Sequence, residues 1–193
     1  MKTLYLVAIG SVPAKVLDWV EEAAAEWFPL SVRRLSALAI PASAYDAKRS
    51  QYQSVEIMKA LAQYAPPDAA RVLGLVAVDL AIPMLTFLFG QAQLDGRVAL
   101  VSLCRLQQEF YGLPANEGLL RERTVKEVLH ELGHTFGLIH CSERKCAMSL
   151  ATHVELVDAK AESYCASCGL RLARRFANDM DGFGSVCASQ SGE

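Results

Sequence analysis

Residues 130–140 read HELGHTFGLIH and contain three of the four histidines in this chain of 193 residues. The spacing of four between His130 and His134 places both imidazoles on one face of a helix, where they can share a metal ion. Gly137 is a residue type at which helices commonly end with a positive φ. A bend there allows His140 to return toward the first two histidines as a third ligand, which a continuing helix would not do.

The residue directly after His130 supplies a second chemical function. Glu131 lies about 100° around the helix axis from His130, so its carboxylate is poorly placed as a ligand and can instead hydrogen-bond a metal-bound water. Three neutral imidazoles suit zinc and leave a fourth position open for that water. Because zinc lowers the pKa of bound water to about 7, the motif predicts a hydrolytic zinc centre with Glu131 as the general base.

Four of the six cysteines follow this motif as two pairs, Cys141 with Cys146 and Cys165 with Cys168. The pattern C-x4-C followed by C-x2-C resembles the two ligand pairs of a closed, tetrahedral structural zinc site. The second pair is predicted to open the last helix, whose N-terminal dipole favours thiolates. A lone C-x-x-C is equally typical of a redox pair, but the presence of the first pair favours structural zinc.

The remaining cysteines, the fourth histidine and a downstream methionine are given simpler interpretations. Cys104 ends a predicted strand and is interpreted as a small buried apolar residue, and Cys187 near the C-terminus as a free thiol. His153 is interpreted as a loop residue. On composition alone Met148 would be a core methionine, but beneath a three-histidine zinc it can support the ligand rings.

The first eighty residues alternate two hydrophobic patterns. The continuous apolar run at 4–9 is typical of a strand covered on both faces. Residues 33–40 and the apolar run at 72–78 are also predicted as strands, and helical periodicity at 16–28 and 55–62 separates the three. This strand–helix–strand–helix–strand order predicts a twisted, mainly parallel sheet with right-handed crossovers.

A different pattern follows, since predicted strands at 86–93 and 97–103 are separated only by Leu94-Asp95-Gly96. A connection that short makes an antiparallel hairpin, with one of its strands at a sheet edge.

The helix that carries the histidines has two possible starts. Thr124 and Glu127 have capping-box spacing, but Thr124 can equally lie inside a helix that begins near Leu119.

The chain after the histidine motif is short and less regular. A final helix is predicted at 166–176, and its residues Arg171, Arg174 and Arg175 are interpreted as a solvated basic face. The polar end at 188–193 is expected to fray.

The composition is that of a globular protein, with 52% hydrophobic and 21% charged residues. A formal net charge of −2 gives no indication of a nucleic-acid partner. No run of about 18 apolar residues predicts a membrane span. The first ten residues are interpreted as a buried strand rather than a signal peptide, so we expect a cytoplasmic protein with cysteines that are thiols or metal ligands.

Residues 130–140, with a methionine downstream, resemble the motif of the metzincin zinc peptidases. Cys141 directly after the third histidine, followed by Cys146, Cys165 and Cys168, is similar to the archaemetzincins in particular. The specific motifs span residues 130–168. A weaker similarity covers the upstream segments 89–92 and 105–112.

The resemblance implies that His130, His134 and His140 bind catalytic zinc with Glu131 as the general base, and that Met148 is the Met-turn residue. It implies a second zinc bound by the four cysteines named above. It also implies an α/β (α+β) metzincin-like fold, in which a mixed twisted sheet of about five strands has an antiparallel edge strand bordering the cleft. We expect one compact catalytic domain, with 1–137 as the N-terminal α/β subdomain that includes the active-site helix and 138–193 as a small C-terminal, zinc-stapled subdomain.

These features together predict a zinc-dependent metallopeptidase, a monomer without nucleic-acid or membrane partners, whose peptide substrate pairs with the strand at 86–93 by strand addition. One alternative is a non-catalytic or barely active metzincin-fold protein that binds peptides or partners, although such a protein has no use for Glu131. Another is a thiol redox protein that uses Cys165 and Cys168. Tyr111 and Tyr164 are candidate oxyanion stabilisers by residue type only, and core or surface roles are favoured for both.

Overall fold

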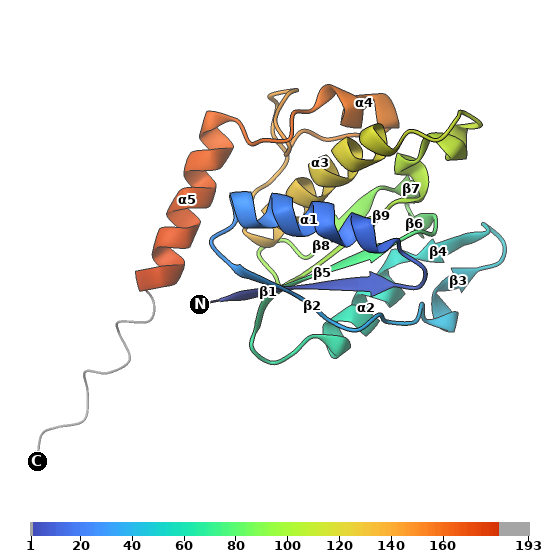
Figure 1. The fold of residues 1–193 in the computed structure, drawn as a ribbon, viewed down its shortest axis with the longest axis horizontal. Helices are drawn as coiled ribbons and strands as arrows, with labels where there is room; N and C mark the ends of the chain where they lie inside the picture. The colour runs from blue at the N-terminus through green and yellow to red at the C-terminus, as the bar shows by residue number, and fades with distance from the viewer. Residues whose placement is uncertain (1, 182–193) are drawn as a thin grey trace, which may run out of the picture.

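The computed structural model describes residues 2–181, and residue 1 and residues 182–193 lie outside the described part. A five-stranded sheet crosses the molecule in the order β2-β1-β5-β9-β8 (Figure 1). Neighbouring strands in this sheet are parallel except β8, which pairs antiparallel with β9 at one edge. The strands are β1 (Thr3–Ile9), β2 (Ser31–Arg34), β5 (Ala69–Val76), β8 (Gly90–Ala92) and β9 (Val98–Ser102).

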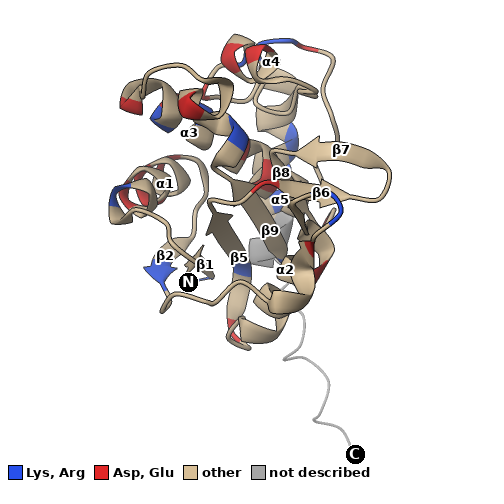
Figure 2. Ribbon diagram, turned by 90° about the vertical axis from the view of Figure 1, so that its right-hand side faces the viewer, with Lys and Arg blue, Asp and Glu red and all other residues tan. Residues whose placement is uncertain are grey.

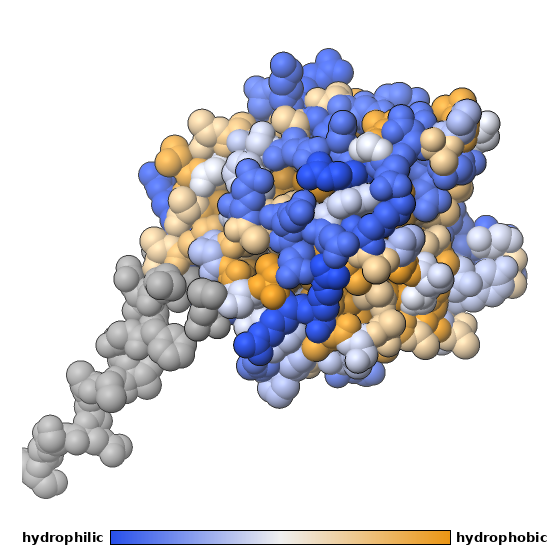
Figure 3. Space-filling model, viewed as in Figure 1, coloured by the Kyte–Doolittle hydropathy of each residue, from blue (hydrophilic) through white to orange (hydrophobic). Residues whose placement is uncertain are grey.

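Helices cover both faces of the sheet, with α1 and α3 on one face and α2 on the other (Figure 1). Charged residues lie mainly on the helices and loops, whereas β9 carries none (Figure 2). In the view of Figure 3 hydrophilic residues predominate over the outer sides of the helices. The helices are α1 (Ala14–Trp27), α2 (Ser54–Tyr64), α3 (Glu117–Thr135), α4 (Val154–Ala159) and α5 (Ala166–Asp181).

The side chains of the central strands alternate between two hydrophobic cores. Along β1, Leu4 and Leu6 belong to the core shared with α1, α3 and α5, whereas Tyr5, Val7 and Ile9 belong to the core shared with α2. The alternation arises because successive side chains of a strand point to opposite faces. Both faces are therefore buried, which explains why the apolar runs of the sequence are continuous and confirms the predicted strand–helix alternation.

The predicted strand at 86–93 is two strands in the structure. Its first part belongs to β7, which pairs with β6 in a second, four-stranded sheet, and its second part is β8 of the large sheet. Phe89 lies between them with its side chain buried in the core. The antiparallel hairpin with β9 and the edge position of β8 are confirmed. The strands of the small sheet are β3 (Tyr45–Asp46), β4 (Gln51–Gln53), β6 (Leu80–Ile82) and β7 (Leu85–Leu88).

The second strand is shorter than the 33–40 that the sequence predicted. Regular pairing of β2 with β1 ends at Arg34, and beyond it only Leu38 makes an isolated bridge to Ile9. The backbone nitrogens of Leu35 and Leu38 still donate to carbonyls of β1. The segment therefore follows the edge of the sheet without continuous strand pairing.

Helix α3 begins at Glu117, close to the earlier of the two predicted starts. Asn116 caps it by accepting a hydrogen bond of 3.0 Å from the backbone nitrogen of Leu119, because an asparagine side chain can satisfy an N–H group that the first turn leaves free. Thr124 lies inside the helix, where its hydroxyl donates to the Leu120 carbonyl at 2.7 Å. The capping-box interpretation is therefore wrong and the longer helix is correct.

The C-terminal part contains more regular structure than expected. The short helix α4 packs against α3, and α5 extends the predicted final helix to Asp181. Of the helices within residues 2–181, none combines the length and the apolar character that a membrane span requires. Cys187 and the polar end at 188–193 lie outside the described residues.

Candidate metal centres and active-site cleft

The three histidines of the motif meet beside the C-terminal end of α3. Gly137 follows the helix with φ of 82°, and the backbone nitrogen of Leu138 donates to the Gly133 carbonyl at 3.1 Å, an arrangement typical of a helix that ends at a left-handed glycine. The chain then turns back toward the helix. The ring centroid of His140 lies 5.2 Å from that of His130 and 5.0 Å from that of His134. One ligand atom from each ring lies within 4.8 Å of the others.

Backbone carbonyls orient the two helical imidazoles. Nδ1 of His130 lies 2.8 Å from the Ala147 carbonyl oxygen and Nδ1 of His134 lies 2.7 Å from that of Leu138. Since a carbonyl oxygen can only accept, each Nδ1 carries the hydrogen and each Nε2 presents a lone pair. The two Nε2 atoms are 3.1 Å apart, where facing lone pairs repel each other unless a cation lies between them. Tetrahedral zinc with Zn–N bonds of 2.0–2.1 Å holds its nitrogen ligands about 3.3 Å apart, so the site fits zinc.

The electrostatic surroundings keep the imidazoles neutral. Burial lowers the pKa of His130 well below its ordinary value, and the nearby charge of Lys160 lowers it further. Burial is also the main cause of the lowered pKa of His134 and of His140. All three rings are therefore unprotonated at neutral pH and available as ligands, as a metal site requires.

Glu131 is buried against the edge strand. Its relative exposure is 5%, and a Cβ atom added to Gly90 would lie 2.6 Å from both Cγ and Oε1 of Glu131. Only a glycine at position 90 of β8 therefore leaves room for the carboxylate of Glu131. Burial raises the pKa of Glu131 well above its ordinary value, Glu127 raises it further, and Lys160 opposes the shift.

Glu131 and the three histidines line one cleft of about 620 Å³. Helix α3 forms the floor, residues 85–92 form one wall, and residues 139–140 with 150–152 form the other. Strands β7 and β8 are each at an edge of their own sheet, so the first wall presents strand edges to the cleft. The cleft thus combines a metal-ligand cluster, an adjacent carboxylate and a surface that can pair with an extended peptide.

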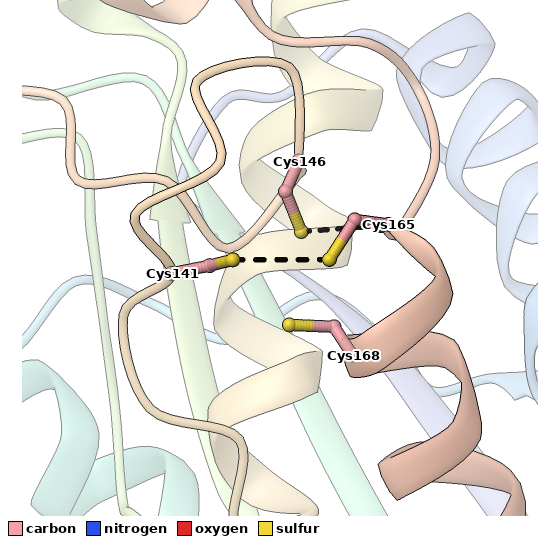
Figure 4. A group of neighbouring side chains, drawn as sticks. All are labelled: Cys141, Cys146, Cys165 and Cys168. Atoms are coloured by element: carbon pink, nitrogen blue, oxygen red, sulfur yellow. Dashed lines mark hydrogen bonds between the residues drawn. The ribbon is translucent and has the colours of Figure 1, made fainter.

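The four cysteines form a second cluster, in which all the sulfur atoms point toward a common centre (Figure 4). Cys141 and Cys146 lie in the loop after α3, whereas Cys165 and Cys168 lie at the start of α5. The Sγ atoms of Cys141 and Cys165 are 3.8 Å apart. That distance is far longer than a disulfide bond of about 2.05 Å and matches the roughly 3.8 Å between ligands of tetrahedral zinc with Zn–S bonds near 2.3 Å.

Backbone N–H groups favour the thiolate form of Cys165, whereas burial raises the pKa of Cys146 and of Cys168. The backbone nitrogen of Cys165 lies 3.3 Å from Sγ of Cys146, and that of Glu143 lies 3.4 Å from Sγ of Cys141. A hydrogen bond from the backbone of Cys168 is the main cause that lowers the pKa of Cys165 to about 7. The cluster therefore provides the donor set of a structural zinc site.

The loop between the cysteine pairs connects the two clusters. Ala147, whose carbonyl orients His130, follows Cys146 directly and donates its own N–H to the Ser163 carbonyl at 2.8 Å. The next residue, Met148, accepts a hydrogen bond of 2.9 Å from the backbone nitrogen of Cys141. Its sulfur packs against Gly133, where an added Cβ atom would lie 2.5 Å away. Met148 thus packs against the segment of α3 between His130 and His134.

Several candidates from the sequence lie elsewhere. The hydroxyl of Tyr164 donates to the Leu129 carbonyl at 2.6 Å and that of Tyr111 to the Arg105 carbonyl at 2.9 Å, and neither residue lines the cleft. Cys104 is half-buried, and His153 is exposed at the start of α4. Of the basic residues on α5, Arg175 forms an ion pair with Asp95.

Sequence reasoning missed two charged residues beside the site. Lys160 places Nζ 2.7 Å from a carboxylate oxygen of Glu127 and 3.5 Å from Nδ1 of His130. Glu127 precedes Glu131 by one helical turn, so its spacing could have revealed that both share a helix face. No comparable signal exists for Lys160, because it reaches the site through the packing of α4 on α3.

The active-site helix, the edge strand and the two ligand clusters define this protein as one of the metallopeptidase class. A model of peptidase family M54 matches residues 36–174. The chain belongs to peptidase family M54.

Relatives and solved structures support this assignment. The archaemetzincin of Methanocaldococcus jannaschii is 40% identical over 167 residues, which cover 86% of this chain and 90% of the relative. The archaemetzincin of Pyrococcus furiosus is 39% identical over 178 residues, covering 89% and 93%. The crystal structure of archaemetzincin from Methanopyrus kandleri superposes with a TM-score of 0.82 at 38% identity, covering 91% of this chain and 96% of that one. A zinc-dependent peptidase from Methanocorpusculum labreanum gives a TM-score of 0.79 at 30% identity, covering 88% and 99%.

Replacing Gly137 by alanine tests the bend that returns His140 to the site. An added Cβ atom would meet only ordinary contacts with Asp95, but a left-handed φ costs a residue other than glycine about 1–2 kcal/mol. We expect Gly137→Ala to lower the free energy of unfolding by about this amount in urea titrations and to weaken zinc binding in chelator competition.

Gly112→Ala is the matched control, since Gly112 also has a positive φ of 73° with open space around it. It should lower the free energy of unfolding similarly and leave the zinc affinity unchanged. Equal zinc affinity of wild type and Gly137→Ala would contradict the prediction.

Proposed function

We propose that this chain hydrolyses peptide bonds, with His130, His134 and His140 as ligands of a catalytic zinc and Glu131 as the general base. The observation that carries the proposal is the pair of Nε2 atoms 3.1 Å apart. Carbonyl hydrogen bonds at Nδ1 leave both Nε2 atoms with a lone pair, and the two rings line a cleft that also contains Glu131. Membership of peptidase family M54 supports the same conclusion. When bound, zinc would supply a Lewis acid that activates water and polarises the scissile carbonyl.

The protein's own residues then have distinct tasks. Glu131 accepts a proton from the attacking water at its carboxylate and later delivers this proton to the amine nitrogen of the leaving peptide. Its position against Gly90 keeps the carboxylate beside the ligand cluster. Strand β8 accepts the extended substrate along its free edge by strand addition. Of the segment 86–93 expected to bind substrate, the proposal therefore uses Gly90–Ala92, the part that belongs to the large sheet.

A second zinc, held by Cys141, Cys146, Cys165 and Cys168, has a structural role in this proposal. It joins the loop after α3 to α5 and so stabilises a region too small to form a core of its own. Because Ala147 is in this loop, the cysteine site also maintains the carbonyl that orients His130. The division of the chain near Gly137 into two subdomains is part of the same proposal.

The proposal extends to action on peptides or proteins as a cytoplasmic monomer with no nucleic-acid or membrane partner. The net charge of −2 gives no indication of a nucleic-acid partner. The cysteines within residues 2–181 form no disulfides, which supports a cytoplasmic location because disulfides are rare in the cytosol.

Replacing Glu131 by glutamine tests the mechanism. Glutamine has the same shape but cannot accept a proton, and general-base catalysis contributes about 10²–10⁴-fold to rate. We expect Glu131→Gln to lose at least about 10²-fold in kcat while retaining two zinc ions per chain, measured by digestion of a peptide library and by metal analysis. A chelator-treated wild type is the control and should cut nothing.

If wild type and Glu131→Gln cut the library equally well, the proposed role of Glu131 is wrong. If the zinc-loaded wild type cuts no peptide, the peptidase proposal itself fails and a binding protein is favoured.

Replacing Cys165 by serine tests the structural zinc site. We expect Cys165→Ser to lower the zinc content from two ions per chain to one in metal analysis and to reduce the thermal stability, since structural zinc contributes directly to folding free energy. Cys104→Ser, at a half-buried cysteine outside the cluster, is the control and should retain two zinc ions. Metal-free protein in which Cys165 and Cys168 oxidise reversibly would instead support the redox alternative.

The walls of the cleft indicate the substrate side chains that bind there. Leu85 and Leu94 on one side, and Ile139 and Leu150 on the other, are between 49% and 59% exposed and line the cleft. No lysine or arginine is among the lining residues. Because exposed apolar side chains gain free energy by burial against apolar ligands, we propose that bulky apolar residues flank the scissile bond.

Matched peptides test this preference. Burial of one leucine side chain is worth about 1.5–3 kcal/mol, so we expect kcat/KM to be at least about 10-fold higher for peptides with leucine or phenylalanine on both sides of the cut than with aspartate or lysine. Leu150→Glu should remove most of this advantage. Leu170→Glu, at a 62% exposed leucine on α5, is the control, and equal cleavage of all peptides would contradict the preference.

A further inference from the structure

Lys160 is a buried ammonium beside the cleft that the proposed mechanism does not use. Its side chain has 0% exposure, and Nζ forms a 2.7 Å ion pair with a carboxylate oxygen of Glu127. The same Nζ lies 3.5 Å from Nδ1 of His130. A charge in such a place is expensive to bury without a partner, so the position of this pair calls for a functional explanation.

The cleft contains two glutamates from the same helix face. Glu127 and Glu131 are one turn apart on α3, both are buried, and both line the cleft next to the histidines. Two carboxylates this close repel each other. Within residues 2–181, Lys160 pairs with Glu127, and no basic side chain lies within ion-pair distance of Glu131. The two glutamates are therefore chemically different, although the helix places them alike.

The backbone of Lys160 is held in place by contacts between α4 and α3. Arg123 forms two hydrogen bonds, of 2.6 and 2.8 Å, with the carboxylate of Asp158. Lys126 reaches the Asp158 carbonyl at 3.2 Å. Lys160 directly follows α4, so these contacts direct its side chain into the interior, where it meets Glu127.

We propose that Lys160 is a positioning residue, which holds the carboxylate of Glu127 away from the three-histidine centre and leaves Glu131 as the one free carboxylate in the cleft. This inference rests on the proposed function. Without Lys160, Glu127 would be a buried, unpaired anion, and a zinc ion bound by the histidines would be the nearest cation. The carboxylate would then turn toward the metal and compete for the position that the mechanism leaves open.

A double-mutant cycle tests this role with the zinc-loaded full chain and an apolar-flanked peptide as substrate. We expect Lys160→Met to lower kcat by about 10²-fold, to retain two zinc ions, and to release the zinc of the histidine site more slowly to a chelator. Glu127→Gln leaves an unpaired ammonium beside His130, and we expect it to weaken zinc binding at that site by about 10–100-fold. The double variant Lys160→Met with Glu127→Gln removes both charges and should recover kcat to within about 10-fold of wild type.

The recovery separates positioning from structural support. If Lys160 only stabilised the packing of α4, the double variant would be as impaired as Lys160→Met, and that result would overturn the proposal. Lys126→Met is the matched control, because Lys126 also joins α4 to α3 but does not contact Glu127. It should lower kcat and change zinc affinity far less than Lys160→Met does, and an effect equal to that of Lys160→Met would also overturn the proposal.

Two further measurements keep the test decisive. If Lys160→Met fails to fold, the folded double variant decides alone, since near-wild-type kcat supports the proposal and a loss of about 10²-fold overturns it. If the wild type cuts no peptide, the proposed function fails, but chelator competition still tests the pairing. Slower zinc release from Lys160→Met than from wild type, reversed in the double variant, supports it, and identical release rates overturn it.

Discussion

The hydrogen bonds from two imidazole Nδ1 atoms to backbone carbonyls are the constraint on which the site depends. The carbonyls of Ala147 and Leu138 determine which nitrogen of His130 and of His134 carries the hydrogen, and so direct both Nε2 lone pairs to one point. Loss of such an outer contact typically lowers metal affinity by about 10–100-fold. In this protein the acceptors are backbone atoms, so their positions depend on the path of the chain after α3.

That path is set by two structural features. Gly137 adopts the left-handed conformation that ends α3 and brings His140 back, and the cysteine cluster holds the loop that contains Ala147 against the start of α5. The three-histidine and four-cysteine clusters are therefore connected through a few residues of this loop. This connection explains how a short region without a large core holds the Ala147 carbonyl and His140 in their positions beside α3.

The grouping of the histidines and cysteines, which local spacing encodes, was predicted correctly, whereas two strand assignments and one short helix were not. The helical spacing of His130 and His134, the glycine bend and the two cysteine pairs all converge as the sequence indicated. The split of 86–93 into β7 and β8 was missed, because both parts read as strand and only their partners distinguish them. Helix α4 was missed because six residues carry too little periodicity for a helix to be predicted.

The sequence by itself determined which histidines, cysteines and glutamate lie together, because residues one to four apart on a helix or beside a turn have fixed relative positions. Only the tertiary structure decided the surroundings of those groups. The contact of Glu131 with Gly90 joins an edge strand to a helix, and the pairing of Lys160 with Glu127 joins residues 33 apart in the chain. Such contacts arise from the packing of whole elements, so no local pattern records them.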